Sequence, residues 1–481
     1  MNILKNKIYV YMATRYLTYG LQFVLSLVIA GKLGPYFLGV YGMVNLIISY
    51  FGQVNFGIPH ALNVLLIHNK NDKYISNAYI LNSLSIYVIL SLLIVLIYCL
   101  LLIAGCNFCA GDYNMETFMP LIVCIAVLTY VNSIFTTVSR VKNDVNLLSI
   151  VGSVPVALNI LVIWFYEEVQ LVYALTGVQL LSALITMLLC YKRDAFPKWD
   201  RKSIRTNYKS DLIKKGIFLF LYNSCFYFIL ISVRTIISSN YSVDEFGYFT
   251  FSFTIANAVM LFIDSFNTII FPKTIDLMSS DDRVALKTSM DKMRIGYAAT
   301  SHMLIYFAMI FYPIFGIILP KYQEAIPTMY MISLTVLMNT TSFGFTSLLI
   351  AKNKERTAGM ISLFALLLNL LLCMFLVKIV EVAFSQVIIG TLISYMFFAF
   401  LCAYEGNKIL SESGSVLFTL KTFFPIRMFI PYCLALGLSI QANAFLMWIP
   451  LATFIFLNRK DLGFLMRVFN KLTNNPSVID V

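Results

Sequence analysis

Long apolar runs separated by short polar loops dominate the chain. A membrane-spanning helix needs about 20 apolar residues, and runs of that length recur. Because the runs are continuously apolar rather than alternating, they predict helices and not barrel strands. We expect an all-α polytopic membrane protein of about fourteen transmembrane helices. The spans are expected near 8–31, 38–58, 78–104, 117–138, 146–166, 171–191, 216–238, 246–271, 296–319, 326–350, 358–378 and 382–404, with a shorter pair near 426–440 and 442–457.

One long polar segment, residues 192–215, interrupts this pattern near the middle of the chain and carries nine Lys and Arg. The apolar runs on its two sides resemble one another, so the segment is interpreted as a linker between two halves. We expect an N-terminal six-helix lobe at 1–191, a basic cytoplasmic linker at 192–215, a C-terminal six-helix lobe at 216–404, a C-terminal helix pair at 405–458 and a cytoplasmic tail at 459–481.

Composition excludes a soluble globular protein. The 481 residues are 60% hydrophobic and only 12% charged, with a mean hydropathy of +0.82, and water cannot solvate that much apolar surface. The net charge of +12 does not predict nucleic-acid binding, because the basic residues cluster in loops beside the spans. The three histidines lack metal-ligand spacing and no glycine-rich phosphate loop is present. We therefore expect no enzyme activity, catalytic residues, cofactor or metal.

The distribution of basic residues predicts the orientation. Of the 35 Lys and Arg, thirty fall in one set of alternate loops and termini, and three, Lys32, Lys321 and Lys378, fall in the other. Positive residues favour the cytoplasmic side, so both termini and the linker are expected there. The external loops are short, and the longest, 105–116, disfavours a polymerase with an external domain. Its Cys106 and Cys109 are either a chance CxxC or an external disulfide.

A weak internal repeat relates the two halves. Gly39 aligns with Gly247 at an offset of 208, Lys142 aligns with Lys352 at 210, and Asn159 meets Asn369 at the same offset of 210. Parallel repeats about an axis along the membrane normal are a transporter architecture. The substrate site is then expected between the lobes.

Three stretches resemble a known family. Residues 33–62, LGPYFLGVYGMVNLIISYFGQVNFGIPHAL, resemble the first loop and second span of polysaccharide flippases of O-antigen and capsule type. Residues 271–283 resemble the inner end of their eighth span, and the stretch around Asn369 resembles their eleventh and twelfth spans. These flippases belong to the multidrug/oligosaccharidyl-lipid/polysaccharide exporter superfamily. The resemblance implies a two-lobed helical flippase of the bacterial cytoplasmic membrane whose cargo is an undecaprenyl-pyrophosphate-linked oligosaccharide.

Ionisable groups inside the spans are few: Arg15, Arg234 and Asp264. Such groups usually face a cavity or a partner, and a guanidinium holds pyrophosphate by paired hydrogen bonds. Arg15 and Arg234 are therefore candidate cargo-binding residues. Two alternatives stay open: Arg15 pairs with Asp264, and Arg234 extends to the outer surface. Asp264 is expected to serve coupling or pairing between the lobes.

Four polar residues inside the expected spans are further candidates for contact with sugar hydroxyls, although hydrogen bonding between helices is the commoner reason for such residues. They are Gln22, Asn45, Gln53 and Asn223.

Two functions compete. One is a flippase that moves a lipid-linked oligosaccharide for O-antigen, capsule or exopolysaccharide assembly by alternating access, with membrane lipids and a polysaccharide polymerase as possible partners. The alternative is an ion-coupled multidrug or toxic-compound exporter of the same fold, which needs an acidic residue in the cavity for cationic cargo. Every acidic residue before position 192 lies in or beside a loop, so the sequence favours anionic cargo.

Overall fold

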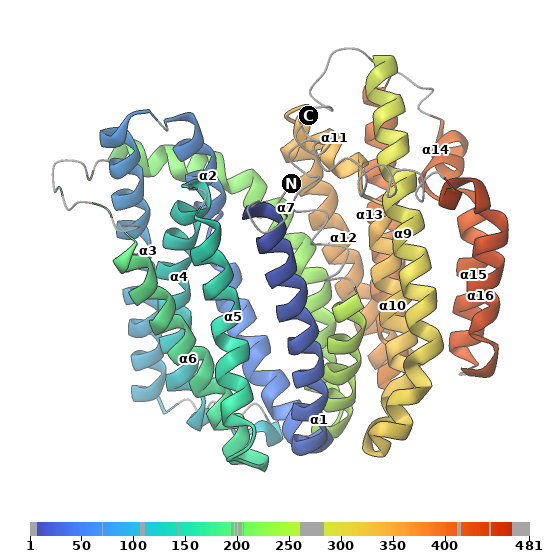
Figure 1. Ribbon diagram of the computed structural model, residues 1–481, viewed down its shortest axis with the longest axis horizontal. Helices are drawn as coiled ribbons and strands as arrows, with labels where there is room; N and C mark the ends of the chain where they lie inside the picture. Colours follow the sequence, from blue (N-terminus) through green and yellow to red (C-terminus); the bar gives the residue numbers. More distant parts are fainter. Residues whose placement is uncertain are drawn as a thin grey trace. The chain divides into compact units, whose positions relative to one another are not determined.

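The structure, a computed structural model, describes residues 7–259, 283–410, 415–441 and 444–463, apart from 70, 106–110, 143, 194–196, 198–199, 201–203 and 205. All regular elements in these ranges are helical (Figure 1). Asp264, Cys106, Cys109 and most of the tail lie outside the described residues, as does the inner end of the expected span 246–271.

Contacts divide the chain into two compact units. The first contains Met1–Tyr227 and Arg234–Thr250, and the second contains Phe228–Val233 and Phe251–Val481. This grouping puts most of the helix that follows the linker with the first unit. The division into lobes at 192–215 stays a prediction.

The first unit is built from seven labelled helices and two short 3-10 turns, followed by helical residues from 243 onward. They are α1 (Lys7–Gln53), α2 (Ile58–His68), α3 (Lys73–Ile103), η2 (Gly111–Tyr113), η3 (Met115–Thr117), α4 (Met119–Val141), α5 (Val145–Val162), α6 (Glu168–Lys192) and α7 (Thr206–Asn240).

The second unit continues in the same all-helical style. Its elements are α9 (Arg283–Ile318), η5 (Pro320–Ala325), α10 (Ile326–Thr340), α11 (Phe345–Ala351), α12 (Glu355–Phe375), the π-helical turn η6 (Leu376–Val380), η7 (Phe384–Gln386), α13 (Ile388–Ile409), α14 (Val416–Phe423), α15 (Ile426–Ile440), η8 (Ala444–Leu446) and α16 (Trp448–Leu457).

Helix α1 is two segments joined at a bend. Its 47 residues would measure about 70 Å at 1.5 Å per residue, more than twice the thickness of the hydrocarbon core. The bend is at Gly34, whose φ of 66° and ψ of 175° are not helical, and Pro35 follows it. Glycine adopts this backbone conformation at little cost. The two segments correspond to the spans expected at 8–31 and 38–58.

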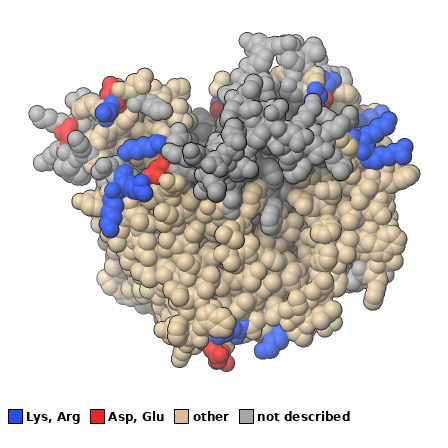
Figure 2. Space-filling model, in the orientation of Figure 1, with Lys and Arg blue, Asp and Glu red and all other residues tan. Residues whose placement is uncertain are grey.

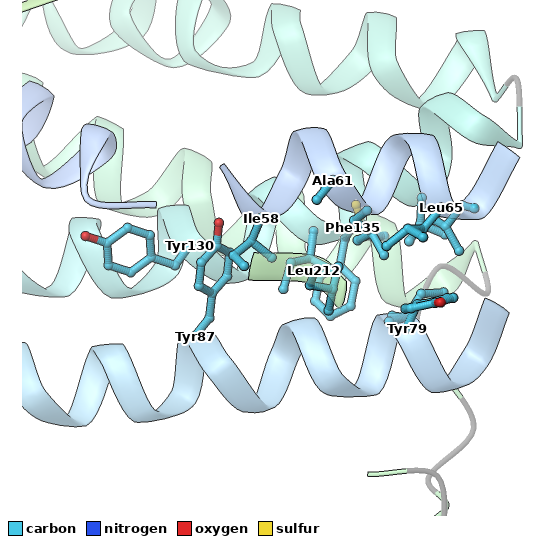
Figure 3. Close-up of a cluster of buried hydrophobic side chains, with 14 of the residues drawn as sticks. Ile58, Ala61, Leu65, Tyr79, Tyr87, Tyr130, Phe135 and Leu212 are labelled. Carbon is cyan, nitrogen blue, oxygen red and sulfur yellow. The ribbon is translucent and has the colours of Figure 1, made fainter. Parts of the chain in front are cut away.

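The second segment of α1 ends inside the unit, at a corner of residues 54–57 before α2. Gly57 has φ of 69°, and the Asn55 side chain accepts a hydrogen bond from its N–H at 2.9 Å. Tyr130 donates to the Phe51 carbonyl at 2.6 Å, and Tyr87 donates to the Asn55 carbonyl at 3.2 Å. Figure 3 shows both tyrosines at one end of the cluster of buried side chains that α2 contributes to. The interrupted helix therefore keeps its buried carbonyls satisfied.

The membrane character of the fold is confirmed, but the count of fourteen spans is not established. Among the described residues, eight helices are long and apolar enough to cross a membrane, or ten if each of two bent pairs is one span. The last expected helix is α16, with only ten residues. In Figure 2 the visible charged side chains lie toward the ends of the helices and the flanks between are almost uncharged. That is the surface expected against lipid.

Candidate substrate site

Close backbone packing joins the second segment of α1 to the helix that begins at residue 243. A β-carbon on Gly39 would overlap the Val243 carbonyl oxygen, and one on Gly247 would overlap the Pro35 carbonyl oxygen. The offset of 208 relates Gly39 to Gly247 and also Pro35 to Val243. Each contact is therefore the repeat-related image of the other. Such an exchange is the signature of a two-fold relation.

A third contact joins two positions that are equivalent in the repeat, so it lies on the local two-fold axis that relates the two helices. A β-carbon on Gly42 would overlap the side chain of Thr250, and these two positions are also 208 residues apart. We call the contacts among residues 35, 39, 42, 243, 247 and 250 the glycine crossing. The aligned glycines found in the sequence therefore lie where the two repeat-related helices touch.

Arg234 lies beside the glycine crossing. Its side chain is buried, with 8% of the residue exposed. Nη2 donates a hydrogen bond to the Gly42 carbonyl at 3.3 Å, and the guanidinium carbon lies 5.9 Å from the centre of the Phe246 ring. The alternative in which Arg234 extends to the outer surface does not match this placement, because the guanidinium is held against α1. A role in cargo binding stays a prediction.

Arg15 is half-buried where α1 packs on α5. Nη1 donates to the Tyr19 hydroxyl at 3.1 Å and lies about 4.0 Å from the position of a β-carbon on Gly152. One turn further along α1, Thr18 and Ser153 share a hydrogen bond of 3.1 Å. The missing side chain at Gly152 makes room for the guanidinium. Arg15 therefore sits in a polar strip between two helices.

Asn45 and Gln53 take part in contacts between helices. The Gln179 amide of α6 donates to Asn45 Oδ1 at 2.9 Å and to the Tyr41 hydroxyl at 3.2 Å. The Ser224 hydroxyl of α7 lies 3.5 Å from Gln53 Oε1 and donates to it. These contacts agree with the alternative of hydrogen bonding between helices, and contact with cargo stays a prediction for both residues.

The other candidates are not brought into one cluster with these. Gln22 is exposed on the first segment of α1, and Asn223 is half-buried on α7. Asp264 lies outside the described residues, so its pairing with Arg15 stays a prediction. Within the described residues no group of three or more His, Cys, Asp or Glu is placed to hold a metal ion.

Two polar residues that matter in the structure were not singled out from the sequence. Gln179 sits in the middle of an apolar run, and that position alone could have marked it. Arg294 precedes the span expected at 296–319, but in the structure it lies within α9, which runs from Arg283 to Ile318. The role of Arg294 follows from its contacts with neighbouring helices.

Arg294 joins three elements of the second unit. Nη2 donates to the Thr422 carbonyl near the end of α14 at 2.8 Å, and the guanidinium carbon lies 3.8 Å from the centre of the Phe345 ring on α11. Asp291, one turn earlier on α9, is 3.6 Å away. A cavity of about 200 Å³ adjoins them, and Lys421 is among its lining residues. A cation at the end of a helix is favourable, so Arg294 holds α14 in place.

Comparison with protein-family models shows the family to which the chain belongs. The model of the polysaccharide biosynthesis protein family matches residues 3–278, which is more than half of the 481 residues. The chain belongs to this family. The resemblance inferred from residues 33–62 is thereby confirmed. A search of curated proteins gives no match.

Solved structures show the fold of this family member. The chain is similar to an inward-facing multidrug resistance MATE family transporter of the MOP superfamily, with a TM-score of 0.66, 14% identity, and coverage of 84% of this chain and 98% of the other. An outward-facing structure of such a transporter matches with a TM-score of 0.60 and 16% identity, and the match covers 85% of this chain and 96% of the other. A MATE structure in the straight conformation matches with a TM-score of 0.59 and 14% identity, and the match covers 85% of this chain and 95% of the other.

Family and fold together identify a multi-pass membrane protein of the polysaccharide biosynthesis family with a transporter fold. They agree with the expectation that the chain is a transporter and not an enzyme. Because the identities to the MATE structures are low, these similarities show the fold and say nothing of the cargo.

Proposed function

We propose that this protein is a flippase that moves an undecaprenyl-pyrophosphate-linked oligosaccharide across the bacterial cytoplasmic membrane. The moving lobes are the two six-helix repeats, and the movement serves assembly of a surface polysaccharide such as O-antigen or capsule. The observation that carries the proposal is the family match, because polysaccharide biosynthesis requires sugars assembled on a lipid to cross the membrane. The transporter fold supports the same reading.

The cargo-binding part of the proposal rests on Arg15. A pyrophosphate cannot cross hydrocarbon without compensation of its charge, and a guanidinium in a protein interior compensates it by two parallel hydrogen bonds. Arg15 is half-buried in a strip that also holds Tyr19, Thr18 and Ser153. A guanidinium in that polar surrounding suits an anionic headgroup better than it suits a cationic drug.

The decisive experiment is transport by purified protein in liposomes, read out as the fraction of a fluorescent lipid-linked oligosaccharide that becomes accessible to an external glycosidase. We expect Arg15→Ala to reduce the initial rate at least tenfold and Arg15→Lys to keep part of it, because Lys retains the charge and loses the planar fork. Arg140→Ala is the matched control, since Arg140 is an exposed arginine at the end of α4.

Unchanged transport in Arg15→Ala liposomes would remove Arg15 from the cargo site. Absence of glycolipid transport by the unmodified protein, together with proton- or sodium-driven efflux of a cationic dye, would instead establish the alternative, an ion-coupled multidrug exporter.

A further inference from the structure

A hollow in the first unit lies at the end remote from its basic loops. It has a volume of about 310 Å³ and is formed by the start of the second segment of α1, by η2 and η3, and by the start of α6. Three partly exposed aromatic residues, Tyr36, Phe37 and Tyr173, line it together with Asn114, Glu116 and Thr117. The lining combines aromatic faces with exposed polar groups.

The walls of this hollow are held in shape by the surrounding structure. The Tyr36 hydroxyl donates to the Asp112 carbonyl at 3.1 Å, which ties α1 to the loop before α4. The Tyr113 hydroxyl, buried below the loop, donates to the Ser238 carbonyl at 3.3 Å. Tyr173 is stacked on the buried ring of Phe118, with ring centres 4.4 Å apart and planes inclined by 19°. The aromatic face of Tyr173 is therefore fixed before any ligand arrives.

We propose that this hollow, the outer aromatic hollow, binds one pyranose unit of a saccharide. A pyranose ring has a C–H face that packs on an aromatic ring and a rim of hydroxyls that hydrogen-bond to carboxylate, amide and hydroxyl groups. Tyr36, Phe37 and Tyr173 supply the aromatic faces, and Asn114, Glu116 and Thr117 supply the polar groups. Ligand sites typically combine an apolar wall with a few polar groups, and their volumes begin near 300 Å³. The hollow has room for one sugar rather than a chain.

This inference rests on the proposed function for its ligand class, because sugars are the part of the cargo that this hollow fits. It adds a subsite in the first unit that is separate from Arg15, which lies along the other segment of α1. The alternative is that the aromatic residues only belong to the belt found where helices meet the membrane surface. Trp164 and Phe165, 73% and 78% exposed in the loop before α6, fit that belt without lining the hollow.

The test measures binding of methyl glycosides of glucose, galactose and N-acetylglucosamine to the purified full-length protein. Binding is detected by saturation-transfer difference NMR. We expect at least one glycoside to bind to the unmodified protein and to a Phe165→Leu control. Tyr173→Leu should weaken that binding at least tenfold through loss of the aromatic face, and Glu116→Gln should weaken it through loss of the stronger acceptor. Tyr36→Leu provides a second aromatic variant at a more exposed position, in case Tyr173→Leu fails to fold.

The proposal is overturned if no glycoside binds to the unmodified protein at millimolar concentration, or if binding is equal in the control and the hollow variants. Binding of tetramethylammonium that is lost in Tyr173→Leu, without binding of any glycoside, would also overturn it, because aromatic faces beside a carboxylate then serve a cation. Failure here is distinct from failure of the proposed function. Normal glycolipid transport by the unmodified protein without glycoside binding rejects only the subsite, whereas glycoside binding that Tyr173→Leu weakens, in a protein that transports no glycolipid, rejects only the flippase.

Discussion

Two arginines with little exposed surface, Arg234 and Arg294, are held by backbone carbonyls and aromatic rings. Arg234 donates to the Gly42 carbonyl beside Phe246, and Arg294 donates to the Thr422 carbonyl over Phe345. A planar guanidinium can do both at once, because its edge donates while its face stacks. A lysine at either position would keep the charge and lose the stacked face.

Substitution of Arg294 is expected to loosen α14. Arg294→Ala removes a charged hydrogen bond and a close cation–π contact, at a cost on the order of 2 kcal/mol. We expect faster hydrogen exchange of the α14 amides, Val416–Phe423, in the variant. The matched control is Lys287→Ala, an exposed cation on the same helix. Exchange in α14 that is equal in the unmodified protein and in Arg294→Ala would contradict the role given to Arg294.

At the scale of elements, the interruptions of helices coincide with polar side chains that satisfy the freed backbone. Tyr87 and Tyr130 do so at the corner between α1 and α2. In the second unit, Gly344 precedes α11, and a β-carbon there would overlap the aliphatic part of Arg294. The corner before α11 is therefore shaped by the same arginine that holds α14.

The glycine crossing gives a prediction about two helices. Gly39→Ala and Gly247→Ala each place a methyl group against a carbonyl oxygen of the opposite helix, so each should force the helices apart. Overpacking of this kind costs about 1–3 kcal/mol. We expect a lower midpoint of thermal unfolding for both variants and a similar loss for each, because the contacts are related by the repeat.

The double variant tests whether the two contacts act as one. Once the helices have been moved apart by one methyl group, the second meets less resistance, so the combined loss should be smaller than the sum. Gly177→Ala in α6 is the control, since nothing lies within 4 Å of an added β-carbon there. If the two decreases in the midpoint of thermal unfolding are strictly additive, or if neither variant lowers the midpoint, the two contacts do not act as one.

At the scale of the whole molecule, the charge pattern predicts orientation. Both termini and residues 192–215 should face the cytoplasm, while Asn107 and Tyr241 face outside. Single cysteines at positions 205, 107 and 241 on a cysteine-free background, labelled from intact cells, provide the test. We expect labelling at 107 and 241 only, and external labelling at position 205 would reverse the assignment.

Much of the architecture could be predicted from the sequence, because hydropathy and charge act locally along the chain. Local patterns predicted the break between the spans 8–31 and 38–58 and the alignment of Gly39 with Gly247. The structure has a bend at Gly34 and close contacts at both aligned glycines. Arg294 lies on a helix that continues beyond the apolar window, so its contacts with α11 and α14 could not be predicted. The burial of Arg234 depends on the Gly42 carbonyl, 192 residues away, and no local pattern reveals such a partner. For the same reason the sequence could propose site residues but not their neighbours.

The glycine crossing also resembles a contact between two identical chains. If the halves on either side of the linker were separate and identical, Gly39 of each would meet the equivalent of Val243 in the other, and Gly42 would lie on the axis. That is an isologous contact, which a homodimer forms from a single surface. One surface of a half-length chain would therefore be enough to form the glycine crossing. Thr250 stands where the first repeat has Gly42, so the two repeats differ on their shared axis.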